Sequence, residues 1–416
     1  MSAIARDRRG IDDRIVNDVA FLCSAEVSTA MSRNRRPWAV LFGCFCMAAG
    51  FNAYLIAPAS IIPLLVDSFG IDKASAGLSI SVFFLAWGMA GLPGGLLMDR
   101  YDNRRLAFVG VVALVLASLA GAATSAYLPF LLTRFVGGAT GAFLWTANAN
   151  VVSRVFPESK LAVATGLFVA AGPAGQAIAQ FGGPLLADVA GWRAVFVVYP
   201  LIVVAGLPVL YLAAREPVRS EEAISLGQFV RVLRNPTILA VSFASACSFA
   251  LFVFFSSWMP TYATEELSID LAAAGAATAL VPFAGIVARP GGGWLSDRIG
   301  ERRRPVIIVS FLLALPVIFG VTTIRSAGGF AVLMLAAGAS VQLAIGVYYV
   351  YVTELAEPGT TGTCLAMVTS VSTIGSLIAP ALAGWLIDAG SWTTGYGFAV
   401  VVALAGIGFV LSTTES

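Results

Sequence analysis

Long apolar runs, each followed by a short charged or glycine-rich turn, repeat along this chain. About twenty consecutive apolar residues are enough to cross a lipid bilayer as a helix. Of the 416 residues, 58% are hydrophobic and only 12% are charged. A soluble domain carries roughly 25% charged residues, so this chain has too little polar surface to form one. We therefore expect an all-α integral membrane protein.

Twelve of these runs have the length of a transmembrane helix, and they fall into two sets of six. The first set covers approximately residues 38–64, 75–97, 106–125, 127–150, 161–185 and 193–213. The second covers approximately residues 236–259, 272–295, 305–324, 328–352, 362–386 and 393–411. The chain then divides into a disordered cytoplasmic tail (1–36), a six-helix bundle (37–214), a cytoplasmic linker (215–235) and a second six-helix bundle (236–416). Met31 offers an alternative start just ahead of the first span.

The distribution of arginine and lysine predicts the orientation of the spans. Cytoplasmic loops of membrane proteins carry an excess of both residues. With the N-terminus inside, most of the 25 basic residues fall in cytoplasmic segments, whereas the extracellular segments hold only Lys73, Arg193 and Arg325. We expect a multi-pass protein of the plasma membrane with both termini in the cytoplasm.

A charged turn occurs once in each set of spans. Residues 95–105 read GLLMDRYDNRR and residues 293–303 read GWLSDRIGERR. Other positions correspond at similar offsets: Ile71-Asp72 with Ile269-Asp270, Gly77 with Gly275, Pro157 with Pro358, and Trp192 with Trp392. The two halves are therefore predicted to be parallel repeats. In transporters with this architecture the substrate site lies between the repeats, near the bilayer midplane.

The charged turn resembles the loop between the second and third helices of the major facilitator superfamily. The resemblance covers nearly the whole chain after Arg36 and implies a secondary transporter that works by alternating access. It implies a cytoplasmic gate formed by the turn residues Gly95, Asp99, Arg100, Arg104, Gly293, Asp297, Arg298 and Arg302. The hypothesis is that Asp99 and the arginines of its loop pair with the other half. The first copy has Asp102 where the family usually has glycine, and we expect Asp102 to adopt the left-handed conformation that aspartate tolerates.

Two arginines lie well inside predicted spans, where charged groups are costly and often functional. Arg134 lies roughly 10 Å from the outer face and Arg289 roughly 12 Å from the cytoplasmic face, at 1.5 Å per residue. Each is a candidate for substrate contact. In the alternative interpretation, Arg134 binds backbone carbonyls and Arg289 extends towards the cytoplasmic gate.

No aspartate or glutamate falls well inside a predicted span, and the chain has no histidine. Two arginines without a fixed counter-ion favour an anionic substrate, because a guanidinium group binds a carboxylate through two parallel hydrogen bonds. The predicted substrate-binding residues are Arg289, Arg134, Gln176, Gln342, Asn52, Tyr54 and Tyr348.

The segment around Arg289 has a finer resemblance. Residues 288–293, which read ARPGGG, resemble the eighth helix of nitrate/nitrite porters and some organic-anion carriers. Those porters have a second arginine in the second helix, where this chain has Gly91. This departure argues against nitrate and is compatible with a different small anion.

The leading interpretation is a permease for a small organic anion. An exporter of drugs or other amphipathic compounds is the alternative, and a transporter-like membrane sensor is a third class. The sequence contains no metal-ligand cluster, nucleophile–base pair or phosphate-binding glycine loop, so we expect neither an enzyme nor a cofactor or metal. The expected partners of the protein, as a monomer, are its small-molecule substrate and the bilayer, with no nucleic acid. The direction of transport and the coupling ion stay open at this stage.

Cysteine labelling tests the predicted topology. Cysteines introduced at Asn103, Glu222 and Glu301 should react with a membrane-impermeant thiol reagent only from the cytoplasm, and Asp72→Cys only from outside. The measurement compares labelling in intact cells with labelling in inverted vesicles. Reaction of Asp72→Cys from the cytoplasmic side would rule out the twelve-span assignment.

Overall fold

The fold was taken from a computed structural model, which describes residues 37–213, 232–357 and 360–413. Within these ranges every regular element is a helix. Eleven helices are long and apolar enough to cross a membrane, and a shorter apolar helix covers Ala194–Val209. The predicted all-α membrane fold with twelve transmembrane helices is therefore confirmed. The predicted tail at 1–36 and most of the predicted linker at 215–235 lie outside the described residues.

Each half of the chain contributes six of the apolar helices. The first half contains the helix Pro37–Ser60, the short α2 (Ile62–Phe69), α3 (Lys73–Arg100), α4 (Asn103–Ala123), α5 (Tyr127–Val155), α6 (Glu158–Ala190) and α7 (Ala194–Ala213). The second half contains α9 (Pro236–Glu266), α10 (Leu271–Thr278), α11 (Leu280–Arg298), α12 (Arg303–Val321), α13 (Ala327–Gln342), α14 (Ile345–Glu354), α15 (Thr361–Ala389) and α16 (Trp392–Leu411). Two spans are interrupted, one between α10 and α11 and one between α13 and α14.

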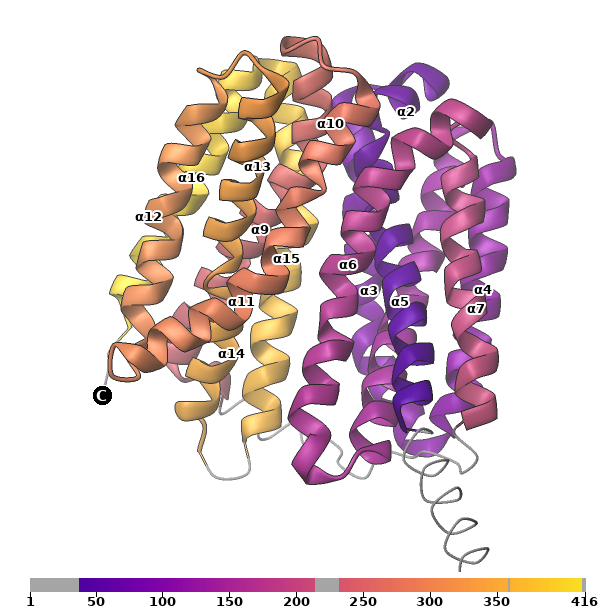
Figure 1. Cartoon of the computed structure of the whole chain (residues 1–416), viewed down its shortest axis with the longest axis vertical. Coiled ribbons are helices and arrows are strands. Elements are labelled where there is room, and N and C mark those ends of the chain that lie inside the picture. The colour runs from indigo at the N-terminus through magenta and orange to yellow at the C-terminus, as the bar shows by residue number, and fades with distance from the viewer. Residues whose placement is uncertain (1–36, 214–231, 358–359, 414–416) are drawn as a thin grey trace, which may run out of the picture.

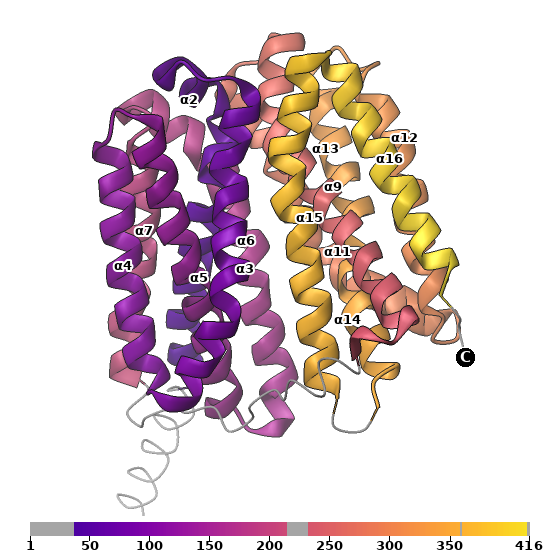
Figure 2. The same cartoon turned by 180° about the vertical axis from the view of Figure 1, so that it is seen from behind.

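The two halves stand side by side, indigo to magenta beside orange to yellow (Figure 1; Figure 2 from behind). We call one end of the molecule the closed end. There α3 and α10 begin, α6 and α15 end, and α2 lies across the top of the view. The opposite end, which carries the turn between α3 and α4, is called the open end. The glycine and polar contacts that join the halves gather at the closed end.

Glycines at matching repeat positions bring the backbones of the two halves together. A Cβ atom added to Gly77 on α3 would lie 2.4 Å from the carbonyl oxygen of Pro380 on α15. One added to Gly275 on α10 would lie 2.4 Å from the carbonyl oxygen of Gln180 on α6. Real Cβ atoms essentially never come nearer than 3.0 Å. The internal repeat therefore builds two similar contacts, and each of them requires glycine.

Polar groups reinforce the closed end. The Lys73 Nζ atom lies 3.2 Å from Oε2 of Glu265, and the backbone N–H of Ala74 donates to Oδ2 of Asp388 at 2.9 Å. Asp72 caps the start of α3 by accepting from the Ser75 N–H at 2.8 Å. Hydrogen bonds with Ser75 also hold the pKa of the Asp72 carboxyl below its usual range, so the cap is charged at neutral pH. Each half thus contributes both charge and helix ends to this contact.

The turn between α3 and α4 differs from the sequence expectation at Asp102. Its backbone is extended, with φ −62° and ψ 118°, and is not left-handed. The carboxylate caps α4 by accepting from the Arg104 N–H at 3.1 Å, and it pairs with the Arg104 guanidinium at 2.9 Å. In the second copy Gly300 and Glu301 do have positive φ, 83° and 61°. Aspartate therefore replaces the glycine by forming a different turn.

A substitution at Gly77 should weaken the closed end. In Gly77→Ala the new Cβ or the Pro380 carbonyl must retreat by at least 0.6 Å, the difference between 3.0 and 2.4 Å. We expect the distance between spin labels at Ser125 and Thr323, measured by double electron–electron resonance without the native cysteines, to shift to longer values. Gly397→Ala is the control, because open space surrounds that position. Identical distance distributions for the two variants would contradict a tight contact at Gly77.

Candidate functional site

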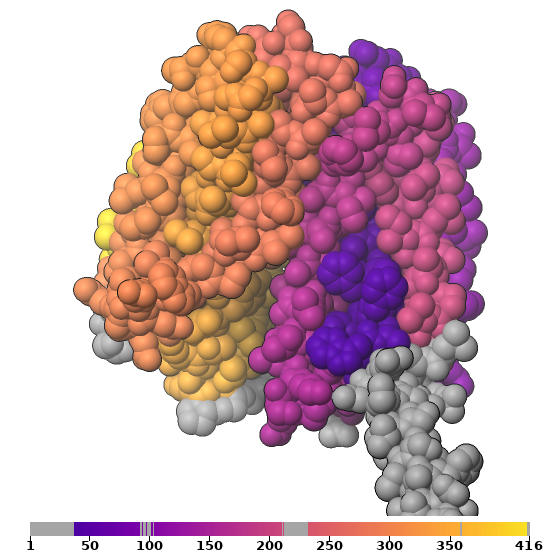
Figure 3. All heavy atoms as spheres, in the orientation of Figure 1, coloured from indigo at the N-terminus to yellow at the C-terminus, as the bar shows by residue number. Residues whose placement is uncertain are grey.

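A cavity of about 410 Å³ lies between the two halves, within the size range of small-molecule sites. It begins where the closed-end contacts stop. On α15 the lining runs from Thr369 to Ser376, one turn before Pro380; on α6 it runs from Val169 to Gln176, one turn before Gln180. Figure 3 shows the surface hollowed between the two halves below their line of contact. The closed-end contacts therefore form the roof of the cavity.

Arg289 on α11 is partly buried and lines the cavity, as predicted from the sequence. Its Nε atom donates to Oε1 of Gln342 at 3.0 Å. The Gln342 amide in turn donates from Nε2 to the Val281 carbonyl at 2.6 Å. A Cβ at Gly285 would lie only 2.0 Å from Oε1 of Gln342, so glycine provides the space for this amide. The two interrupted spans are thus joined by a hydrogen-bond chain that fixes the guanidinium.

Gln342 itself was predicted to bind substrate, but in the structure it lies outside the cavity lining. The side chain is fully buried at the end of α13 and does not line the cavity. Its two amide ends are occupied by Arg289 and by a backbone carbonyl. Gln342 therefore positions Arg289 and has no group left to offer to a solute.

The guanidinium of Arg289 has no carboxylate partner among the described residues. The one hydrogen bond that the described residues give it uses Nε, so both terminal nitrogens are left for another partner. The acidic side chains of the described spans lie at helix ends, such as Glu354 on α14 and Asp388 on α15. The cavity therefore presents one positive charge without a fixed counter-ion.

Two amides on the opposite wall were also predicted correctly as cavity residues. Asn52 donates from Nδ2 to the Ala48 carbonyl at 2.9 Å, which directs its oxygen towards Gln176. Gln176 donates from Nε2 to that oxygen at 3.4 Å. The Oε1 atom of Gln176 is consequently buried without a partner among the described residues. This wall of the cavity holds an acceptor that needs a donor.

Arg134 is not a cavity residue, which corrects the predicted substrate contact. Its side chain is 0% exposed. The guanidinium donates to three backbone carbonyls: Ser79 at 3.1 Å, Tyr54 at 3.0 Å and Leu55 at 2.6 Å. The rings of Tyr54 and Phe83 lie 4.6 Å from its Cζ atom. Arg134 therefore joins α5 to α3 and to the first helix, and it has no surface for a solute.

Tyr54 and Tyr348 also lie outside the cavity lining, contrary to prediction. Both are fully buried. Tyr54 packs against Arg134, and the Tyr348 hydroxyl shares a hydrogen bond with Ser248 at 2.8 Å. The neighbouring Tyr349 lines the cavity instead. Sequence reasoning also missed the aromatic lining of the first half, Phe84, Trp87 and Trp145, because apolar aromatic residues look alike whether they face a cavity, a helix or lipid.

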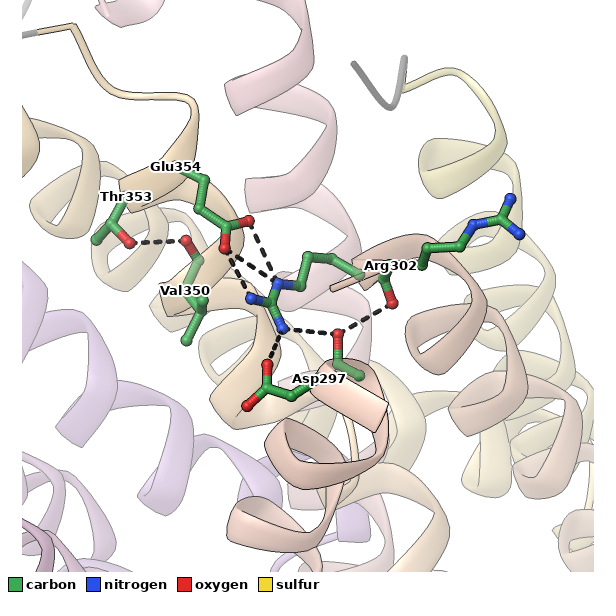
Figure 4. Close-up of polar contacts among 7 residues, drawn as sticks. Asp297, Arg302, Val350, Thr353 and Glu354 are labelled. Atoms are coloured by element: carbon green, nitrogen blue, oxygen red, sulfur yellow. Dashed lines mark hydrogen bonds and ion pairs between the residues drawn. The ribbon is translucent and has the colours of Figure 1, made fainter. Parts of the chain in front are cut away.

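The second charged turn forms an ion cluster within its own half (Figure 4). Arg303 binds Oδ1 of Asp297 at 2.6 Å and Oε1 of Glu354 at 2.8 Å. Arg302, one of the predicted gate residues, accepts a hydrogen bond from Ser296 through its carbonyl, and its side chain points away from the cluster. In this conformation Arg303 on α12 therefore joins Asp297 on α11 to Glu354 on α14.

The remaining gate residues are only partly described. Arg298 stacks over the Trp294 ring at 5.2 Å, and Gly293 has open space where a Cβ would lie. Gly95 and the side chains of Asp99 and Arg100 lie outside the part of the chain whose surroundings are described. Pairing of Asp99 with the other half stays a prediction.

The contacts of Arg134 predict a structural role that can be measured. Arg134→Gln removes at least two of the three charge-assisted hydrogen bonds to buried carbonyls, and a hydrogen bond to a charged group contributes about 1.5–3 kcal/mol. We expect a marked fall in the melting temperature of the purified protein. Arg289→Gln removes a single hydrogen bond, the one to Gln342, and should lower the melting temperature much less. If the Arg134→Gln variant melts normally but binds no substrate, the structural role is contradicted and a role of Arg134 in substrate binding is supported.

Sequence and structure comparisons agree with this architecture. The chain is 25% identical over 399 residues to the hexuronate transporter of Bacillus subtilis, covering 88% of this chain and 93% of the relative. It is 27% identical to the multidrug resistance protein MdtG of Salmonella typhimurium (67% and 71% covered) and 23% identical to the nitrite extrusion protein of B. subtilis (64% and 66% covered).

Solved structures share the fold. A bacterial homolog of the human lysosomal transporter Spinster, in an inward-facing and unoccupied conformation, matches with a TM-score of 0.72 at 17% identity, covering 90% of this chain and 94% of that one. The sequence model of the Major Facilitator Superfamily matches residues 40–366 and 264–416. The chain therefore belongs to the major facilitator superfamily of membrane transporters.

Proposed function

We propose that this protein is a secondary transporter that moves a small organic anion across the plasma membrane by alternating access. The observation that carries this proposal is Arg289, a guanidinium that lines the central cavity without a carboxylate partner among the described residues. A charge at this depth is costly in a membrane protein and marks a functional group. An anionic solute would supply the missing counter-charge.

The geometry around Arg289 favours a carboxylate. Gln342 accepts the hydrogen bond from Nε, so both terminal nitrogens of the guanidinium are available to a single ligand. Two N–H groups on a planar fork match the two oxygens of a carboxylate and form charge-assisted hydrogen bonds. The cavity of about 410 Å³ also has room for a solute much larger than nitrite or nitrate.

Relatives support this proposal and also its alternative. The hexuronate transporter and the nitrite extrusion protein are named for anions. MdtG is named for multidrug resistance, and the aromatic first-half wall of Phe84, Trp87 and Trp145 is an observation that favours amphipathic compounds. Export of such compounds is therefore the second candidate function. The unpaired charge of Arg289 favours the first.

Alternating access assigns the two ends of the structure to the two sides of the membrane. The predicted charge asymmetry places both termini, and with them the open end, in the cytoplasm. The closed end then faces outside, and the described conformation is open to the cytoplasm. The two bundles, with bounds near 37–214 and 236–416, would rock about the cavity within a monomer. Separation of Gly77 from Pro380 and of Gly275 from Gln180 would admit solute from outside.

Substitutions at Arg289 test the proposed function. Arg289→Ala should abolish stabilisation by small carboxylates, because loss of a buried charge-assisted pair costs about 2–5 kcal/mol. Arg289→Lys keeps the charge without the fork and should retain part of the binding. A carboxylate at a hundred times its Kd raises the unfolding free energy of wild type by roughly 2.7 kcal/mol, which a thermal-shift screen detects.

The screen also contains tetraphenylphosphonium, a cationic amphipathic compound, as a contrast. Gly397→Ala serves as the matched variant, because it lies away from the cavity. If tetraphenylphosphonium stabilises both wild type and Arg289→Ala while no carboxylate does, the anion proposal fails and drug export becomes the better assignment.

A further inference from the structure

We infer that the solute is a polyhydroxylated monocarboxylate, a sugar acid in chemical terms. This inference rests on the proposed function, because it assigns one carboxylate to Arg289. It adds the chemistry of the rest of the solute, which follows from the hydrogen-bond polarity of the other cavity walls.

One wall of the cavity is a row of hydroxyl groups on α15. Thr369, Ser372, Thr373 and Ser376 all line the cavity. Their spacing of three, four and seven residues from Thr369 puts them on one face of the helix. A continuous hydroxyl face beside Arg289 is polar but carries no charge.

The protons of this row are largely committed to the helix backbone. Thr369 donates to the Leu365 carbonyl and Thr373 to the Thr369 carbonyl, both at 2.9 Å. Ser372 lies 2.6 Å from the Val368 carbonyl as a donor. A hydroxyl has one proton and two lone pairs. Since these protons are used, Thr369 and Thr373 present lone pairs to the cavity and favour donors on the solute, whereas Ser372 already shares a second hydrogen bond with Ser245 at 2.7 Å.

The opposite wall of the cavity also carries a hydrogen-bond acceptor. Asn52 is held by the Ala48 carbonyl, and Gln176 in turn is held by Asn52. The carbonyl oxygen of Gln176 is left buried and unpartnered among the described residues. A buried acceptor without a donor costs roughly 1–3 kcal/mol, which a hydroxyl of the solute would relieve. An acceptor without a donor thus lies at the edge of the cavity in the first half, and the threonine hydroxyls of α15 lie in the second half.

The first-half wall adds aromatic surface. Trp87 and Trp145 line the cavity, and Trp145 packs against Phe168 with ring centroids 4.9 Å apart. Aromatic faces carry partial negative charge and attract weakly positive hydrogens. The axial carbon-bound hydrogens of a pyranose ring form such a face, whereas its equatorial hydroxyls point to the rim. A sugar acid therefore satisfies the aromatic wall, the acceptors and Arg289 together.

A single guanidinium also limits the charge of the solute. Among the described residues that line the cavity, Arg289 is the one cation. A dicarboxylate or a phosphate dianion would leave about one negative charge uncompensated in a low-dielectric site, which is unfavourable. The solute therefore carries one carboxylate and several hydroxyls.

Isothermal titration of the purified full-length protein with matched compounds tests the inference. D-gluconate and D-glucuronate carry both features. Hexanoate and cyclohexanecarboxylate keep the carboxylate without hydroxyls, and D-glucitol and D-glucose keep hydroxyls without the carboxylate. We expect at least one sugar acid to bind at least tenfold more tightly than its hydroxyl-free analogue, and the neutral polyols to show no measurable binding.

Two substitutions separate the hydroxyl contacts from the charge. Thr373→Val and Gln176→Leu should each weaken binding of the sugar acid about five- to tenfold and leave hexanoate binding unchanged. Thr353→Val is the matched control. Thr353 also donates to a backbone carbonyl, that of Val350 at 2.7 Å, but it does not line the cavity. This control should bind like the wild type.

The outcomes distinguish this inference from the proposed function. Equal binding of hexanoate and gluconate, lost in Arg289→Ala, would overturn the sugar-acid assignment and leave the anion transporter standing. Binding of glucitol or glucose that survives Arg289→Ala would overturn both. Absence of binding by both sugar acids to a protein that is stabilised by another carboxylate would also overturn the assignment.

Discussion

The hydrocarbon core of a bilayer offers no water to a buried charge, and this constraint explains the placement of both deep arginines. Each guanidinium must find its hydrogen bonds inside the protein or from a solute. Arg134 donates its hydrogen bonds to three backbone carbonyls and thereby holds helices of the first half together. Arg289 makes one hydrogen bond with the described residues, from Nε to Gln342, and its terminal nitrogens are left for a partner in the cavity. The same kind of side chain thus serves structure in one half and lines the cavity in the other.

The internal repeat shows where the two halves have kept the same function and where they have diverged. At the closed end the two copies have the same function, because Gly77 and Gly275 make equivalent contacts across the interface. The charged turns diverge. Asp102 caps a helix where Gly300 has a positive φ. Glu354 completes the ion cluster of the second half, and the corresponding position of the first half, counted back from Pro157, is Ser153. The glycine contacts between the halves therefore occur in both copies of the repeat, whereas Gly300 and Glu354 have a different residue in the first copy.

The fold and part of the site could be predicted from the sequence, for reasons that particular residues make clear. The length of the apolar runs fixes the number of spans, because the bilayer has one thickness. Arg289, Asn52 and Gln176 were identified because polar groups are conspicuous in an apolar helix. Tyr348 was predicted in place of Tyr349, since one residue along a helix rotates a side chain by about 100° and no sequence pattern fixes that rotation here. Trp87 and Trp145 gave no signal at all, because lipid-facing and cavity-facing aromatic residues have the same composition.

The glycine contacts at the closed end have a consequence for the medium in which the protein can work. They join uncharged backbone to uncharged backbone, so dissolved ions have little to screen. The ion pair of Lys73 with Glu265 lies beside them and is partly exposed, and an exposed pair contributes at most about 1 kcal/mol. Closure of this end therefore depends on shape much more than on charge. A contact built in this way should change little with the salt concentration of the solution that bathes it.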